Sequence, residues 1–72
     1  MDVPSQEMLR VLRQARLYGY LQARAGRLFH PGGNKALCRV ETAEAMEFAG
    51  WLKRDADRYD ITPEGISAEA MH

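Results

Sequence analysis

The sequence predicts one small α+β domain, built in the order helix, β-hairpin, helix, β-hairpin and short C-terminal turn. Two segments carry apolar residues at helical spacing, and each precedes a stretch of β-compatible residues interrupted by turn-forming ones. A chain of 72 residues has room for a single domain. We expect this domain to span residues 5–66, between an N-terminal tail of residues 1–4 and a frayed C-terminal tail of residues 67–72.

The first helix is predicted over residues 6–17. Ser5 is a suitable N-cap residue, and Glu7 in the first turn complements the positive end of the helix dipole. The apolar residues at three-and-four spacing are Met8, Leu9, Val11, Leu12 and Ala15. Gly19, between two tyrosines, predicts that the chain leaves the helix in an extended conformation.

A Gly-rich hairpin is expected next, with arms at residues 27–30 and 35–40. The residues between the arms, which favour a chain reversal, are Pro31, Gly32, Gly33 and Asn34. A second helix follows over residues 42–50, with Thr42 as its N-cap and Gly50 at its C-terminal end. The sequence shows no evident internal repeat.

The second hairpin is expected over residues 52–62, with its turn at residues 55–57. Thr62 followed by Pro63 has the pattern of an N-cap and a first helical residue, so one more helical turn is predicted before Gly65 interrupts it. The residues expected to supply the core are Met8, Leu9, Val11, Leu12, Leu17, Leu21, Leu28, Phe29, Leu37, Val40, Met46, Phe48, Trp51, Leu52, Tyr59 and Ile61.

Cysteine content and hydropathy bear on the cellular location. Cys38 is the only cysteine, so the chain forms no internal disulfide, which favours a reducing compartment. No apolar run is long enough to cross a membrane, and no signal-peptide pattern opens the chain. The expected location is the cytoplasm, without a membrane partner.

The stretch AGWLKRDADRYDITPEG, residues 49–65, resembles the closing segment of winged-helix domains. In that superfamily a helix ends at a glycine followed by an apolar residue, a two-stranded wing has charged residues at its tip, and the second wing strand often ends in Leu/Ile-Thr-x-x-Gly. The corresponding parts here are residues 49–52, 55–58 and 61–65. The resemblance covers residues 40–66 and implies a winged-helix-like fold. The usual winged helix has two helices after its first strand, where this sequence has a hairpin and one helix.

Charge is unevenly distributed along a chain whose formal net charge is zero. Residues 1–40 carry seven basic and two acidic side chains, a net charge of +5, whereas residues 41–72 carry three basic and eight acidic ones, a net charge of −5. Such asymmetry marks a nucleic-acid or membrane surface, or two solvated faces that neutralise each other. The second helix carries Glu44 and Glu47, with Glu41 just before them, and no base-reading side chain, so duplex DNA would repel it.

Two functional hypotheses remain open. In the first, the chain is a non-catalytic interaction or regulatory module that docks on a protein partner, or on itself as a homodimer, through its oppositely charged halves. The candidate partner-binding residues are Glu41, Glu44, Glu47, Tyr18 and Tyr20. In the second, it is a nucleic-acid-binding regulator of the winged-helix type that grips phosphates. The candidate basic residues are Arg10, Arg13, Arg16, Arg27, Arg39, Lys53, Arg54 and Arg58.

The sequence does not predict an enzyme. Cys38 and His30 lie in opposed arms of the first predicted hairpin, but a lone cysteine in a strand is far more often a compact apolar residue than a nucleophile. Asp55 and Asp57 lie at an exposed turn, an unsuitable setting for acid–base catalysis. Cys38, His30 and His72 are too few and too scattered for a metal site. We therefore expect no metal, no cofactor and no small-molecule substrate.

Overall fold

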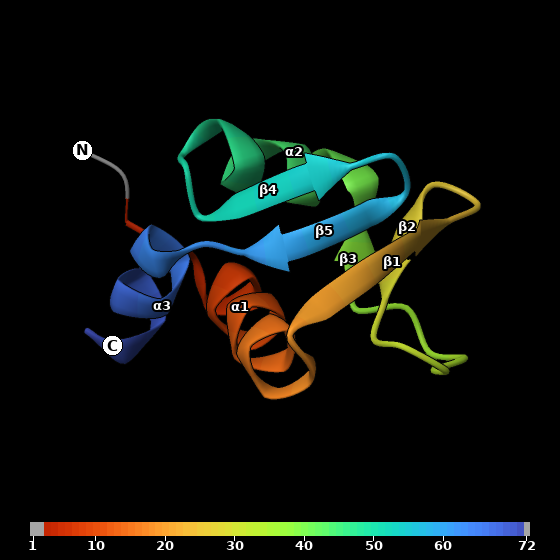
Figure 1. The fold of residues 1–72 in the computed structure, drawn as a ribbon, viewed down its shortest axis with the longest axis horizontal. Helices are drawn as coiled ribbons and strands as arrows, with labels where there is room; N and C mark the ends of the chain where they lie inside the picture. The colour runs from red at the N-terminus through yellow and green to blue at the C-terminus, as the bar shows by residue number, and fades with distance from the viewer. Residues whose placement is uncertain (1–2, 72) are drawn as a thin grey trace.

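The structure is a computed structural model in which residues 3–71 are described. Its elements, in chain order, are α1 (Gln6–Tyr18), β1 (Tyr20–Arg24), β2 (Arg27–Phe29), β3 (Cys38–Arg39), α2 (Val40–Phe48), β4 (Leu52–Asp55), β5 (Arg58–Ile61) and α3 (Pro63–Ala70). The five strands form one antiparallel sheet in the order β3-β2-β1-β5-β4 (Figure 1). The predicted α+β class is confirmed.

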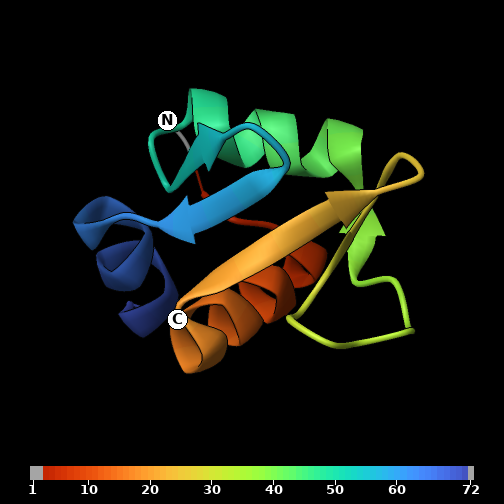
Figure 2. The same cartoon turned by 45° about the vertical axis from the view of Figure 1, so that its right-hand side comes forward.

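Helices α1 and α2 pack on one face of the sheet and leave its other face open to solvent (Figure 2). The core between helices and sheet consists of Val11, Leu12, Ala15, Leu21, Leu28, Cys38, Ala43, Met46, Trp51, Leu52 and Tyr59. Successive side chains of a strand point to opposite faces of its sheet. The residues that alternate with the buried strand residues therefore lie on the open face.

Helix α1 forms as predicted and extends one residue further, to Tyr18. The Ser5 hydroxyl accepts a hydrogen bond from Met8 N at 3.1 Å, which satisfies one of the free N–H groups of the first turn. Gly19 ends the helix in the left-handed conformation, with φ of 89°, and its N–H donates to Ala15 O at 2.7 Å. The expected exit into extended chain is confirmed, because β1 begins at the next residue.

The predicted pairing of the first hairpin is confirmed, but a hairpin that was not predicted precedes it. Strands β1 and β2 form this hairpin around Ala25 and Gly26, which both have positive φ. The arm predicted at residues 27–30 does pair with the arm predicted at 35–40, but as β2 and β3 joined by a longer loop. Strand β1 was missed because its place is decided by tertiary pairing: it lies between β2 and β5 with Leu21 buried in the core.

The second helix and hairpin form close to their predicted places. Helix α2 begins at Val40, before the predicted cap Thr42, and its N-cap residue Arg39 makes no side-chain capping bond. Gly50, with φ of 88°, lies just beyond the helix end. Strands β4 and β5 pair along their whole length, with a turn at Ala56 and Asp57.

The C-terminal segment differs from the prediction, because α3 continues through Gly65 to Ala70. The frayed tail predicted from residue 67 is therefore wrong for residues 67–70. The Thr62 hydroxyl accepts from Gly65 N at 3.0 Å, as expected of an N-cap, and also donates to Gly50 O at 2.6 Å. Thr62 thus joins the start of α3 to the segment that links α2 to β4.

Two large residues predicted for the core are exposed. Leu17 is 71% exposed and Phe48 is 94% exposed. The buried side of α1 is defined by Leu12 and Ala15, and the buried side of α2 by Ala43 and Met46. With 100° between successive helical residues, Phe48 lies 160° away from Met46 around the helix, so it cannot reach the sheet.

The two helix and hairpin units repeat each other at an offset of 31 residues, which corrects the expectation of no internal repeat. Gly19 and Gly50 follow the two helices with φ of 89° and 88°, and Ala25 and Ala56 occupy the two turns with φ of 50° and 59°. The leucine two residues after each glycine is buried. The backbone makes the repeat visible, because few side chains are shared between the units.

Candidate nucleic-acid interface

The open face of the sheet, called here the outer sheet face, carries a concentration of positive charge. Its residues are Tyr20, Gln22 and Arg24 of β1, Arg27 and Phe29 of β2, Arg39 of β3, Lys53 and Asp55 of β4, and Arg58 and Asp60 of β5. None of these side chains is buried. Five are cationic and two are anionic, so this face has a net charge of +3 in a chain with a formal net charge of zero.

Three arginines form a row across neighbouring strands of this face. Arg24 is directly opposite Arg27, and Arg27 is directly opposite Arg39. All three are exposed. Like charges directly opposite one another destabilise a sheet, and local violations of this kind are expected at functional sites. We call these residues the arginine row.

Two aromatic rings lie on the same face, and a guanidinium covers each. Arg24 Cζ is 4.1 Å from the centre of the Phe29 ring, and Arg58 Cζ is 4.1 Å from the centre of the Tyr20 ring. Both distances are within the range of cation–π attraction. Phe29 is opposite Gln22 in the sheet, and Gln22 lies two residues after Tyr20 on β1. Phe29 and Tyr20 are therefore diagonal neighbours, about 7–8 Å apart.

Positive charge is concentrated at the β3-β2-β1 end of the face. At the other end Lys53 is opposite Asp60, and Asp55 is opposite Arg58. Arg58 Nε donates to Asp60 Oδ1 at 2.8 Å, and this hydrogen bond raises the pKa of Arg58. The arginine row has no acidic residue opposite it in the sheet pairing. Arg24 Nη2 donates to Gly33 O at 2.7 Å, which holds the β2–β3 loop beside the row.

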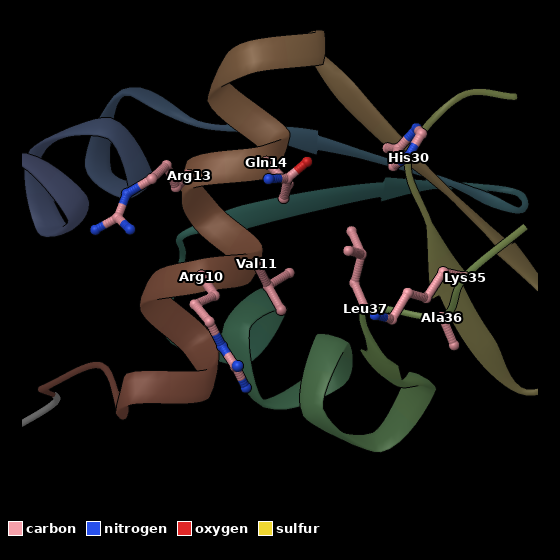
Figure 3. Close-up of a pocket in the computed structure, with 8 residues that line it drawn as sticks. All are labelled: Arg10, Val11, Arg13, Gln14, His30, Lys35, Ala36 and Leu37. Atoms are coloured by element: carbon pink, nitrogen blue, oxygen red, sulfur yellow. The ribbon is translucent and has the colours of Figure 1, made fainter. Parts of the chain in front are cut away.

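A second basic surface lies on the helix side of the sheet. Helix α1 and the β2–β3 loop border an open groove of about 520 Å³ (Figure 3). Its lining residues are Arg10, Val11, Arg13, Gln14, His30, Lys35, Ala36 and Leu37. In Figure 3 the Arg13 side chain extends toward α3 and away from His30 and Lys35. None of the three residues of the arginine row lines this groove.

Helix α3 partly neutralises the basic side of α1. Arg16 Nε is 2.9 Å from Glu69 Oε1, and Arg13 Nε is 3.5 Å from Glu69 Oε2. Within residues 3–71 the buried Oε1 accepts no hydrogen bond, so its contact with Arg16 is an ion pair. Glu69 is 6% exposed, and among residues 3–71 it is the one charged residue that is buried.

The structure divides the predicted nucleic-acid-binding set between two surfaces. Arg27, Arg39, Lys53 and Arg58 share the outer sheet face. The residues on the helix side are Arg10, Arg13 and Arg16. Arg54 is opposite the buried Tyr59, so it points to the inner face, and its Nε donates to Ala56 O at 3.0 Å. The predicted residues therefore do not all lie on one face of the domain.

The predicted partner-binding residues are also separated. Glu41, Glu44 and Glu47 are exposed on α2. Tyr18 stacks on His30 with ring centres 4.6 Å apart, whereas Tyr20 lies on the outer sheet face. The two tyrosines do not share a surface, because Tyr18 is the last residue of α1 and only Tyr20 belongs to a strand.

The chain matches no protein family, no curated protein sequence and no solved structure. Within residues 3–71, no helix is long and apolar enough to cross a bilayer, and no three His, Cys, Asp or Glu side chains gather where they could hold a metal ion.

Sequence reasoning missed Gln22 and Phe29 as site residues. A usable signal was present, because Tyr20, Gln22 and Arg24 alternate with the apolar Leu21 and Ala23, as expected of a strand with one open face. The alternation identifies these residues only if residues 20–24 form a strand of the sheet, and the sequence-based fold contains no such strand.

Cys38 is a core residue in this structure. Its side chain is 7% exposed, and burial, with a smaller contribution from Glu7, raises the pKa of its thiol to about 11. The thiolate is the reactive form of cysteine, so this environment suppresses nucleophilic chemistry at neutral pH. Burial also raises the pKa of Tyr59, which packs in the same core.

The raised pKa of Cys38 predicts a loss of stability at alkaline pH. The unfolded chain releases the thiol proton near the ordinary pKa of 9.0, whereas the folded chain keeps it up to about pH 11. The free energy of unfolding should therefore fall as pH rises from about 9 to 11, by up to about 2 kcal/mol. Urea unfolding across this range checks the prediction. In Cys38→Ala the free energy of unfolding should fall less over this pH range, and the remaining fall comes from Tyr59, whose pKa is also raised. A fall as large as in the wild type would show that Cys38 is not its cause.

Proposed function

We propose that this protein is a non-catalytic, nucleic-acid-binding domain of winged-helix-like organisation that holds a single strand across its outer sheet face. The observation that carries the proposal is the arginine row, three exposed cations side by side with no opposite acid. Arginine pairs with phosphate through a planar fork of donors, and neutralising phosphates is the main source of affinity for nucleic acid. Of the two hypotheses drawn from the sequence, we therefore prefer nucleic-acid binding over protein docking. The residues that carry it are those of the outer sheet face.

A single strand fits this face better than a duplex does. Unstacked bases can stack on aromatic rings and on arginine guanidinium planes, and the Phe29 and Tyr20 stacks supply both. A duplex hides its base faces and is read by side chains that enter a groove. Helix α2, which occupies the recognition-helix place in the expected winged-helix organisation, exposes glutamates that phosphates would repel.

The winged-helix-like part of the proposal rests on residues 40–65. Helix α2 is followed by Gly50 and the charged β4–β5 hairpin, and β5 is followed by the Thr62 cap. These features support the resemblance, whereas strands β2 and β3 stand where the usual fold has another helix. In the proposed mode the wing contributes through Lys53 and Arg58 of the outer sheet face, rather than through α2.

Fluorescence anisotropy with short labelled oligonucleotides tests the proposal. The probes are mixed-sequence single-stranded DNA and RNA and a DNA duplex of the same length, titrated over a range of salt concentrations. We expect the single strands to bind more tightly than the duplex, with affinity falling steeply with salt. Arg27→Glu/Arg39→Glu should weaken single-strand binding at least about tenfold, since two phosphate contacts become repulsive.

The matched control is Arg10→Glu/Lys35→Glu, which makes the same charge change at the groove. This variant should retain most of the single-strand affinity. Phe29→Leu should weaken single-strand binding and leave any duplex binding unchanged, because it removes stacking but no charge. The proposal fails if no probe binds at low salt, or if the groove variant loses binding and the outer-face variant keeps it.

A further inference from the structure

We propose that this protein associates with a second copy of itself by placing α1 of one copy along α2 of the other. The proposal does not depend on nucleic-acid binding, because it uses helix surfaces on the other side of the sheet. The charge asymmetry of the sequence raised self-association in general terms. The internal repeat now points to two particular surfaces and to their alignment.

Corresponding exposed positions of the repeat carry opposite charges in the two helices. At the offset of 31 residues the three pairs are Arg10 and Glu41, Arg13 and Glu44, and Arg16 and Glu47. All six residues are exposed. Each set spans seven residues, or about 9 Å along a helix axis from the first to the last. A row of arginines on α1 and a row of glutamates on α2 therefore have the same spacing and length.

An exposed apolar residue follows each charged row at corresponding positions. Leu17 follows Arg16 and is 71% exposed, and Phe48 follows Glu47 and is 94% exposed. Aromatic and apolar side chains that a monomer leaves in water are favoured at the centre of interfaces. If the two helices lie parallel and in register, each arginine lies at the level of its corresponding glutamate, and Leu17 lies at the level of Phe48. An antiparallel alignment would place Leu17 at the Glu41 end, so the parallel one is preferred.

The chain itself shows that a carboxylate can dock on the arginines of α1. Glu69 of α3 contacts Arg13 and Arg16 through their Nε atoms. The two arginine side chains remain 57% and 53% exposed, so each is still accessible to a carboxylate of another molecule. Glu69 neutralises one of the two charges, and Arg10, at the other end of the row, has no ion pair among the described residues.

Sedimentation equilibrium of the full chain tests whether the association exists. At low salt the average mass should rise with concentration above the monomer mass of 8.2 kDa. Raising the salt to about 1 M, where the Debye length is about 3 Å, should weaken the association at least about tenfold, since exposed charge pairs orient the two copies. A monomer at all concentrations in low salt would overturn the proposal.

Two double variants test the parallel alignment. The α1 variant is Arg10→Glu/Leu17→Glu, and the α2 variant is Glu41→Arg/Phe48→Arg; neither changes the arginines that hold Glu69. Each variant alone should be monomeric, because the charge pair of positions 10 and 41 becomes repulsive and the apolar contact of positions 17 and 48 is lost. An equimolar mixture should associate again. The substituted α1 of one variant then meets the substituted α2 of the other, with opposite charges at positions 10 and 41 and at positions 17 and 48.

Two results of this experiment overturn the proposal: association of either variant alone at the wild-type level, and a mixture that stays monomeric. The matched control is Arg27→Glu/Arg39→Glu, which exchanges two charges on the outer sheet face and should associate as the wild type does. Loss of association in that control would place the interface on the sheet and would equally overturn the proposal. Thermal unfolding of every variant establishes that each one is folded.

Discussion

Replacement of Gly65 by alanine is expected to lower the free energy of unfolding by at least about 3 kcal/mol. A Cβ atom at this position overlaps the backbone carbonyl oxygen of Trp51 and lies 2.9 Å from Ile61 Cγ1. The carbonyl is held in place, because it accepts a hydrogen bond from Thr62 N at 3.1 Å. Helix α3 would have to move away from the start of β4, and a domain of this size has little stability to lose.

Two controls separate this steric effect from other effects of alanine. Ser67→Ala changes an exposed residue of α3 and should alter stability by less than about 0.5 kcal/mol. Gly19→Ala meets no atom within 4 Å but has φ of 89°, so it should cost about 1–2 kcal/mol through backbone strain alone. Urea unfolding followed by circular dichroism gives the three values. A Gly65→Ala variant less destabilised than Gly19→Ala would contradict the packing of α3 on Trp51.

The C-terminal segment shows what sequence patterns can and cannot predict. Thr62 and Pro63 were identified correctly as the start of a helix, because capping is a local property of a few residues. The local pattern predicts that Gly65 breaks the helix, yet its role is to allow a close approach to Trp51. The continuation to Ala70 depends on Glu69 and its contacts with another helix, which no local pattern contains.

The first half of the sheet illustrates the same limit. The stretch from Pro31 to Asn34 has a strong turn composition, so the hairpin was centred there. The observed turn at Ala25 and Gly26 has a weaker signal, because alanine seldom adopts a φ of 50°. The arginine row could not be predicted without this register, since it requires Arg24, Arg27 and Arg39 to be opposite one another on three strands. By contrast, α1, α2 and the β4–β5 hairpin were predictable from periodicity and turn residues alone.

The contact of Glu69 with Arg13 and Arg16 predicts an asymmetric response to mutation. Glu69→Gln leaves two arginines that are more than half exposed and can be hydrated, so it should cost about 1 kcal/mol or less. Arg13→Gln/Arg16→Gln leaves a carboxylate that is 6% exposed without a compensating charge, which is a much larger penalty. We expect this double variant to lose about 2–3 kcal/mol, below the full cost of breaking a buried pair because solvent partly screens the arginines.

The triple variant Arg13→Gln/Arg16→Gln/Glu69→Gln decides between this account and a simple loss of contacts. If the penalty comes from an uncompensated buried charge, removal of that charge should recover part of the stability lost in the double variant. If the side chains act only through packing, the three losses should add, and the triple variant should be the least stable. Urea unfolding at neutral pH measures all three variants. Additive losses would show that the charge of Glu69 carries no penalty when the two arginines are replaced, and that α3 is held mainly by the contacts around Gly65.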